Sequence, residues 1–430
     1  MIALRERFQH VTDVRWNFWT LGMDIAFFTF GLSVTSAYTI LPLYVHHLTN
    51  ANWPVALITA LRSLGLFAPT LFVAARVERL WRVKPNLLVM TQFERIPLLI
   101  MAIATVFLAY HYNVLLLVIF FIMITLQAAG SGLSSSSWLD MISRAIPTTM
   151  RGRFLGGWSG VGALFGIGGG VLAAAFLRIF LWPWNFAACF TVTFIAFVIS
   201  FFLLAMGREP VRTEVHAPLP TGGSPWQRFH VWSANVIIIV QQDRRFRRYI
   251  VANAIAGTAT IANGLLALVA IRQAHFTPEM VGIQTTVLLV AIAIGNFLWG
   301  FIGDHFSHRL VLVLSAAVGT LAMVLALFGV NVWTITGAFF CFGLSDSGLV
   351  LGRMNFIIEI GPPARLPMYI GLAALLGAPF VTISPLIGGF IADIWGYTPL
   401  LLLAIGLGIA SIATFALYVP KSAPTPLPII

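Results

Sequence analysis

Charged residues are scarce in this sequence. Only 9% of its 430 residues are Asp, Glu, Lys or Arg, whereas a soluble domain carries roughly 25%. Hydrophobic residues make up 59% of the chain, and the mean hydropathy is +0.93. A water-facing surface cannot be built from so few charges, so a soluble globular protein is excluded. Most of the surface must face lipid.

Cysteine is almost absent as well. Cys189 and Cys341 each lie in an apolar run, so the sequence offers neither a disulfide framework nor a metal-ligand spacing. It also lacks a phosphate-binding loop and paired histidine ligands. We therefore predict no metal site and no cofactor. The charged stretch from Arg5 to Arg15 leads into an apolar run too long for a signal-peptide core, which predicts an uncleaved first helix.

Long apolar runs fill the rest of the chain. A bilayer core about 30 Å thick needs about 20 residues per helix. Twelve runs meet this requirement and predict an all-α membrane protein with transmembrane helices at 17–45, 54–75, 86–109, 113–146, 152–177, 185–206, 246–271, 280–302, 309–330, 333–360, 366–392 and 397–419. The predicted domains are an N-terminal six-helix bundle at 1–206, a linker at 207–245, a C-terminal six-helix bundle at 246–420, and a disordered tail at 421–430.

The basic residues predict the orientation of these helices in the cytoplasmic (inner) membrane. If both termini are cytoplasmic, all but four of the 25 lysines and arginines lie on the cytoplasmic side or at its edge. The four exceptions are Arg62 and Arg95 within helices, and Arg178 and Arg272 outside. This pattern accounts for the net charge of +11, so membrane lipid rather than nucleic acid is the predicted partner.

The linker carries its own pattern. Aromatic and aliphatic residues recur at helical spacing between Trp226 and Val240, and four arginines follow from Arg244 to Arg248. This predicts a helix at the cytoplasmic interface, with its arginines near anionic lipid. An amphipathic linker packed on the protein is the alternative.

The chain repeats itself after six helices. The segment Glu78-Arg79-Leu80-Trp81-Arg82 corresponds to Asp304-His305-Phe306-Ser307-His308, which is typical of transporters built from parallel repeats. Gly300-Phe301-Ile302-Gly303-Asp304-His305-Phe306-Ser307-His308-Arg309 resembles the Gly-x-x-x-Asp-x-x-x-x-Arg/Lys signature of the major facilitator superfamily (MFS). Arg151-Gly152-Arg153-Phe154-Leu155-Gly156 resembles the basic turn into that family's fifth helix. The first copy of the signature departs from the pattern, with Ala74 for its glycine and Glu78 for its aspartate.

The resemblance implies two pseudo-symmetric six-helix halves that move a small solute by alternating access, without enzymatic activity. It also implies a cytoplasmic gate, in which glycine lets two helices approach closely and charged residues hold one side shut. The predicted gate residues are Glu78, Arg79, Asp140, Arg144, Arg151, Arg153, Gly300, Asp304, Arg309 and Arg353. The alternative is that these charges only obey the positive-inside rule.

Charges within the helices are the strongest functional candidates, because each costs about 2.5–3.5 kcal/mol on insertion scales. At 1.5 Å per residue, four acids lie in one slab below the bilayer midplane: Asp24, Glu94, Asp140 and Asp346. Arg62 lies at a depth within about 4 Å of Asp24, which predicts an ion pair. Neighbouring helix positions point about 100° apart, so Glu94 and Arg95 are predicted not to pair.

Two interpretations of these charges remain. Asp24 and Asp346 are either protonatable carboxylates whose protonation is linked to solute binding, or permanently paired struts between helices. The candidate coupling and substrate residues are Asp24, Arg62, Glu94, Arg95, Asp346, Asn263 and Gln127. The favoured function is proton-coupled efflux of a cationic or amphipathic compound. The alternative is an importer or uniporter of a neutral or anionic metabolite, with Arg62 or Arg95 as the anion ligand.

Overall fold

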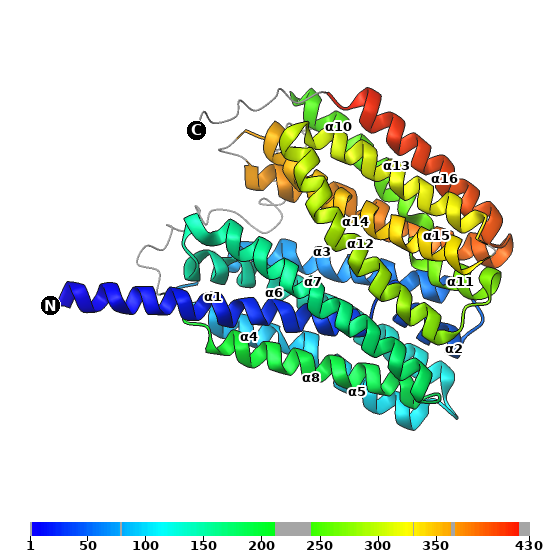
Figure 1. Cartoon of the computed structure of the whole chain (residues 1–430), viewed down its shortest axis with the longest axis horizontal. Coiled ribbons are helices and arrows are strands. Elements are labelled where there is room, and N and C mark those ends of the chain that lie inside the picture. Colours follow the sequence, from blue (N-terminus) through cyan, green and yellow to red (C-terminus); the bar gives the residue numbers. More distant parts are fainter. Residues whose placement is uncertain (1, 78–79, 211–241, 330, 363–365, 421–430) are drawn as a thin grey trace, which may run out of the picture. The chain divides into compact units, whose positions relative to one another are not determined.

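A computed structural model describes residues 2–77, 80–210, 242–329, 331–362 and 366–420, and every regular element in these ranges is a helix (Figure 1). The helices before the linker are α1 (Ile2–Val34), α2 (Ile40–Leu48), α3 (Trp53–Val77), α4 (Lys84–Met90), α5 (Gln92–Leu108), α6 (Asn113–Ala145), α7 (Thr148–Ile179) and α8 (Trp184–Met206). Those after it are α10 (Arg244–Thr258), the 3₁₀ segment η1 (Ala259–Leu265), α11 (Leu266–Ala274), α12 (Pro278–His305), α13 (His308–Leu327), α14 (Val332–Ile360), α15 (Leu366–Ile394), α16 (Tyr397–Ala413) and the π-helical turn η3 (Thr414–Tyr418).

Ten helices in the described ranges are long and apolar enough to cross a membrane. Two of these are composite: α4 and α5 act as one span, and so do α10, η1 and α11. The other two predicted spans correspond to α1 with α2, and to α3, whose apolar part is Trp53–Phe67. The chain is therefore a multi-pass membrane protein of the predicted all-α class.

Three predicted spans are interrupted where backbone hydrogen bonding changes. The first breaks between Val34 and Ile40, and the third breaks at Thr91. The seventh passes through η1, where the hydroxyl of Thr260 donates to the carbonyl oxygen of Gly257 at 2.7 Å. A side chain that takes a backbone acceptor competes with the α-helical ladder, which favours the tighter 3₁₀ winding here.

The helices cluster into two units by their contacts: Met1–Ala217 with Phe276–Thr286, and Pro218–His275 with Val287–Ile430. The beginning of α12 thus groups with the first unit. Most of the predicted linker, including its proposed interfacial helix at 226–240, lies outside the described residues, as does the tail at 421–430. Those two assignments remain predictions.

Each unit has its own apolar core. In the first unit, α1 packs on α7 and α8, and α6 packs on α3 and α5. Leu21, Phe154 and Trp158 are buried together there. In the second unit, α13 packs on α14 and α16, and α10 packs on α15, while a second cluster contains Tyr249 and Phe356.

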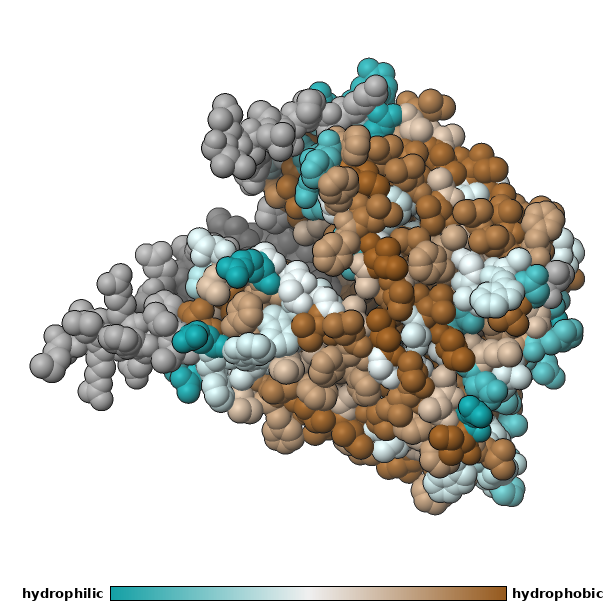
Figure 2. Space-filling view, viewed as in Figure 1, coloured by the Kyte–Doolittle hydropathy of each residue, from teal (hydrophilic) through white to brown (hydrophobic). Residues whose placement is uncertain are grey.

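Large apolar side chains also cover the outside of the helices. Figure 2 shows hydrophobic residues over most of the visible face, with hydrophilic residues gathered toward helix ends. The side chain of Phe297, on α12, is 87% exposed. Surfaces of this kind are stable only against lipid, which agrees with the hydropathy of the spans.

Candidate functional site

Asp24 lies in the second half of α1 and is 5% exposed. One of its carboxylate oxygens accepts a hydrogen bond from the hydroxyl of Ser200, on α8, at 2.6 Å. The other accepts from the indole N–H of Trp138, on α6, at 3.1 Å. Three helices therefore converge on this carboxylate. The predicted ion pair of Asp24 with Arg62 is wrong, because no such pair occurs among the described residues.

Arg95 lies beside this group on α5, and each of its three guanidinium nitrogens donates a hydrogen bond. Its Nε donates to the carbonyl oxygen of Phe197 at 2.8 Å, and Nη1 donates to that of Thr91 at 2.6 Å. Its Nη2 donates to the hydroxyl oxygen of Ser200 at 3.4 Å. The guanidinium carbon also lies 5.2 Å from the ring centre of Phe201, close enough for a cation–π interaction.

Glu94 completes the cluster and corrects a second expectation. Its Oε2 lies 3.7 Å from Nη1 of Arg95, so these sequence neighbours do pair. The reason is that the long arginine side chain folds back one helical turn to the Thr91 carbonyl, which carries its charge toward Glu94. Glu94 also accepts a hydrogen bond from the hydroxyl of Ser134, on α6, at 2.5 Å.

A glycine makes room for Glu94 against α6. A Cβ placed on Gly130 would stand 2.8 Å from the backbone carbon of Phe93 and 2.9 Å from the nitrogen of Glu94. Real side chains do not tolerate such contacts with backbone. Only glycine lets α6 approach α5 this closely, and that approach places Ser134 within hydrogen-bonding distance of the carboxylate.

Ser200 links the two halves of the cluster, since its hydroxyl donates to Asp24 and accepts from Arg95. We call Asp24, Glu94, Arg95, Ser134 and Ser200 the buried charge network. The two acids and the arginine are each no more than 5% exposed. The network contains two carboxylates and one guanidinium, so with both acids ionised it carries one uncompensated negative charge. Sequence reasoning missed both serines, and it did not identify Trp138 as a hydrogen-bond donor to Asp24.

Two other candidates lie apart from this network. Gln127 is 5% exposed and lines a small cavity in the first unit with Thr35, Met101 and Phe190. Asn263, on η1, lines a cavity in the second unit that encloses about 40 Å³ accessible to the centre of a water molecule. Roughly 10–15 Å³ suffices for one water, so the second cavity has room for a few waters.

Asp346 and Arg353 lie on α14 in the second unit, separated by seven residues. Each interacts electrostatically with the other, and Arg353 also with Tyr249 of α10. No ion pair joins them within the described part of the chain. Their positions, two helical turns apart, put them on the same face of α14.

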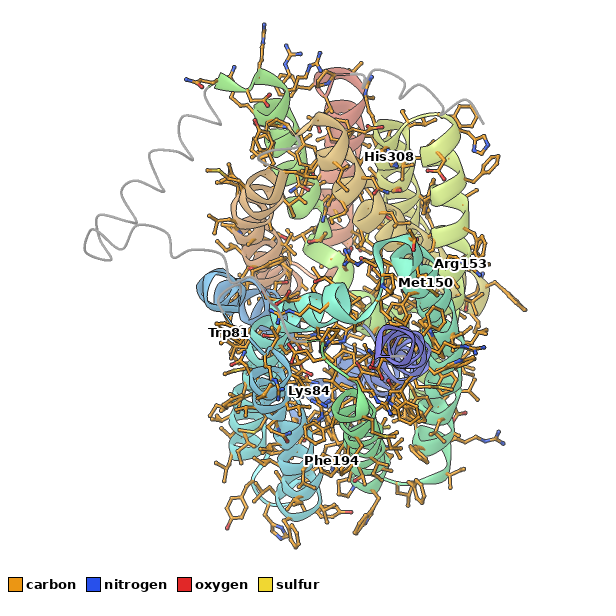
Figure 3. The ribbon with its side chains drawn as sticks, turned by 90° about the vertical axis from the view of Figure 1, so that its left-hand side faces the viewer. Trp81, Lys84, Met150, Arg153, Phe194 and His308 are labelled. Carbon is orange, nitrogen blue, oxygen red and sulfur yellow. The ribbon has the colours of Figure 1, made fainter. Side chains whose placement is uncertain are left out.

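Arg144, a predicted gate residue, anchors one end of the first unit. Its guanidinium pairs with Asp140 at 2.6 Å and with Glu209 at 3.1 Å. It also donates to the carbonyl oxygens of Leu80 and Trp81, each at 3.0 Å. Figure 3 looks onto this end of the helices and labels Trp81. The arrangement fastens the loop before α4 to the end of α6.

Glu209 was not predicted, yet it organises this same end. Its two carboxylate oxygens accept from the backbone N–H groups of Val83 and Lys84, at 2.6 and 3.0 Å. These are among the free N–H groups that begin α4, and a carboxylate there is favoured by the helix dipole. Lys84, labelled in Figure 3, donates in turn to the carbonyl oxygen of Gly207 at 2.9 Å.

The remaining predicted gate residues of the first unit have different surroundings. Arg151 donates to the backbone carbonyls of Ile146, at 3.0 Å, and Ser143. It therefore stabilises the turn between α6 and α7. Arg153 is exposed. Glu78 and Arg79 lie outside the described residues, so their predicted role remains untested.

In the second unit, a Cβ placed on Gly300 would meet no neighbouring element within 4 Å among the described residues, and the gating role of Gly300 remains a prediction. Asp304 is exposed. Arg309 donates to the backbone carbonyls of Phe415, at 3.0 Å, and Ala416, so it caps η3. A contact that was not predicted joins α13 to α14 beside them: Nδ1 of His308 lies 3.0 Å from Glu359.

Comparison with known proteins agrees with this architecture. Residues 248–429 match the family model described as "Major Facilitator Superfamily". No curated protein sequence matches the chain.

The fold is similar to three solved transporters. The nucleoside transporter NupG has a TM-score of 0.65 at 11% identity, covering 94% of this chain and 99% of that one. A bacterial metal transporter has a TM-score of 0.64 at 12% identity, with coverages of 94% and 99%. An inward-facing bacterial homologue of the iron transporter ferroportin has a TM-score of 0.68 at 13% identity, with coverages of 94% and 98%. Residues 248–429 of this chain thus match the superfamily model, and the fold of the whole chain is similar to that of these solved transporters.

Proposed function

We propose that this protein is a proton-coupled secondary transporter that exports a cationic or amphipathic organic compound by alternating access, without enzymatic activity. We place it in the cytoplasmic membrane with both termini inside, because this orientation keeps most lysines and arginines on the cytoplasmic side. The observation that carries the proposal is the buried charge network, in which two carboxylates share one guanidinium.

The charge balance of the network supports proton binding. An uncompensated charge away from water is costly, and the cheapest remedy available to a carboxylate is to bind a proton. One proton shared by Asp24 and Glu94 would leave the network neutral with Arg95. The same network would be negative without it, and a cationic solute would then replace the proton. Competition of this kind between proton and cation is what exchange across a membrane requires.

The hydrogen-bond partners of Arg95 argue against an anionic metabolite as the solute. Arg95 donates to two carbonyls and one hydroxyl and also pairs with Glu94, which leaves it poorly placed to bind an anionic metabolite. Arg62 keeps that possibility open, because it is half-buried and forms no ion pair with a described acid. The nucleoside and metal named for the similar structures do not decide between solutes, since identities of 11–13% establish only the fold.

The test is cation-driven proton release from energised everted membrane vesicles, with ethidium and tetraphenylphosphonium as cations. We expect the wild-type protein to exchange at least one of them for protons. Asp24→Asn should abolish the exchange. The matched control is Asp13→Asn, on the same helix, where the aspartate side chain is 41% exposed. Undiminished exchange by Asp24→Asn, or no exchange of either cation by the wild type, would contradict the proposal.

A further inference from the structure

Arg353 has two buried hydrogen-bond donors without an acceptor. Its Nε and Nη2 are both out of reach of solvent, and neither has a hydrogen-bond partner in the described part of the chain. These two nitrogens form one edge of the planar guanidinium. Their N–H groups point in parallel, and this fork matches the two oxygens of a carboxylate or phosphate.

An unpaired edge of this kind is unfavourable, because a buried charged donor loses water and gains nothing in return. Arg95 shows the usual solution in this protein, with acceptors for Nε, Nη1 and Nη2. Among the described residues, no acceptor meets the Nε–Nη2 edge of Arg353.

The acid that acts on Arg353 electrostatically does not supply the missing acceptor. Asp346 lies on the same face of α14, about 10.5 Å earlier along the helix axis. Its field reaches Arg353, but no salt bridge or hydrogen bond connects them. The carboxylate of Asp346 and the guanidinium of Arg353 thus lie on the same face of α14 without pairing. The Nε–Nη2 edge of Arg353 has no acceptor among the described residues.

We propose that this face of α14 binds a zwitterionic solute, with its oxyanion on the Nε–Nη2 edge of Arg353 and its cationic centre against Asp346. The solute class is a compound that carries a carboxylate or phosphate a few bonds from an amine or quaternary ammonium group. This inference rests on the proposed function, and it specifies that the transported compound carries an oxyanion in addition to its cationic centre. It also reassigns Arg353 from the predicted gate to solute binding.

Binding to the purified full-length protein tests the proposal, with probes matched in pairs. Glycine betaine carries a carboxylate and phosphocholine a phosphate, whereas choline has the same cation alone. Phenylalanine and its methyl ester form a bulkier pair. We expect at least one zwitterion to bind at least about tenfold more tightly than its cation-only analogue, since two charge-assisted hydrogen bonds are added. Which probe binds best distinguishes carboxylate from phosphate.

Variants at Arg353 then test the fork. Arg353→Met should remove the preference for the zwitterion, and Arg353→Lys should retain only part of it because an ammonium cannot donate two parallel bonds. Arg178→Met, at an exposed position on α7, is the matched control and should bind like the wild type. The absence of any zwitterion preference, or a preference that survives Arg353→Met, would overturn the proposal.

The ligand-free protein provides a second readout. Arg353→Met removes donors that satisfy no partner, so the melting temperature without solute should not fall below that of Arg178→Met. A marked fall would mean that the guanidinium has a structural partner, and the inference would fail.

Equilibrium binding needs no proton gradient. A zwitterion preference that depends on Arg353 would therefore stand even if proton exchange failed. Conversely, proton exchange of simple cations would stand if the zwitterion preference were absent.

Discussion

Removing the guanidinium of Arg95 should expose how the buried charge network is balanced. Arg95→Met keeps much of the side-chain volume but deletes the only cation among two buried acids. It leaves the carbonyl oxygens of Phe197 and Thr91 without their donors and removes the cation–π contact with Phe201. Glu94 loses its partner at 3.7 Å.

The expected cost follows from these contacts. A hydrogen bond to a charged group contributes about 1.5–3 kcal/mol, and removal of one partner from a buried ion pair costs about 3–5 kcal/mol. We expect Arg95→Met to lower the free energy of unfolding by about 3–5 kcal/mol, because relaxation and the retained methionine volume offset part of the lost bonds. The exposed Arg153→Met should change it by less than about 0.5 kcal/mol.

A double-mutant cycle separates charge from packing. Glu94→Gln preserves an oxygen for the Ser134 hydroxyl but removes the negative charge. The double variant Arg95→Met/Glu94→Gln should therefore recover about half of the loss, about 1.5–2.5 kcal/mol. The coupling energy is this recovery plus the cost of Glu94→Gln alone, and values up to about 3 kcal/mol are usual for interacting neighbours. Reversible unfolding in mixed detergent micelles, followed by tryptophan fluorescence, measures all four species.

Two results would refute this reasoning. A cost of Arg95→Met below about 1 kcal/mol would place it with ordinary substitutions, so the guanidinium could not be holding the network together. A double variant no more stable than Arg95→Met alone would mean that Glu94 is already neutral beside Arg95. The shared proton would then reside on Glu94 rather than being exchanged within the network.

Three further outcomes are expected. Glu209→Gln should destabilise the start of α4 by about 1–2 kcal/mol through the loss of a charged cap, seen as faster amide hydrogen exchange at Lys84; unchanged exchange would contradict the capping role. Gly130→Ala should cost about 1–3 kcal/mol because its new methyl group meets the backbone of α5, whereas Gly160→Ala, with no described atom within 4 Å of the virtual Cβ, should be tolerated in the same thermal-shift assay. Arg178→Cys, in a background without native cysteines, should react with a membrane-impermeant maleimide on intact cells, and protection from the reagent would contradict the proposed orientation.

The fold was predictable because a membrane imposes a strong constraint on sequence. Twelve apolar runs and a six-helix repeat were enough to indicate the class, and the signature around Asp304 lies in the segment that matches the family model. The prediction of which acids are buried also follows from depth along the helix. Asp24 and Glu94 are indeed 5% and 3% exposed.

The partners of these acids could not be predicted, because depth fixes only one coordinate of a side chain. Arg62 matches Asp24 in depth, but rotation about the helix axis decides which neighbour a residue meets, and Asp24 meets Ser200 and Trp138 instead. Serines are common in transmembrane helices, so nothing in the sequence distinguished Ser200 from the others. The pairing of Glu94 with Arg95 was missed because the directions of two Cβ atoms do not determine where a long arginine ends.

The 3₁₀ segment η1 gives the seventh span an adjustable length. A 3₁₀ helix rises about 2.0 Å per residue and an α-helix about 1.5 Å, so rewinding the seven residues of η1 into α form would draw its ends together by about 3.5 Å. Such a change breaks backbone hydrogen bonds and forms new ones with partners one residue further along the helix. The hydroxyl of Thr260 already donates to the carbonyl oxygen of Gly257. The seventh span can thus change its length within η1. An axial displacement of this size is then absorbed locally, and the whole helix need not tilt.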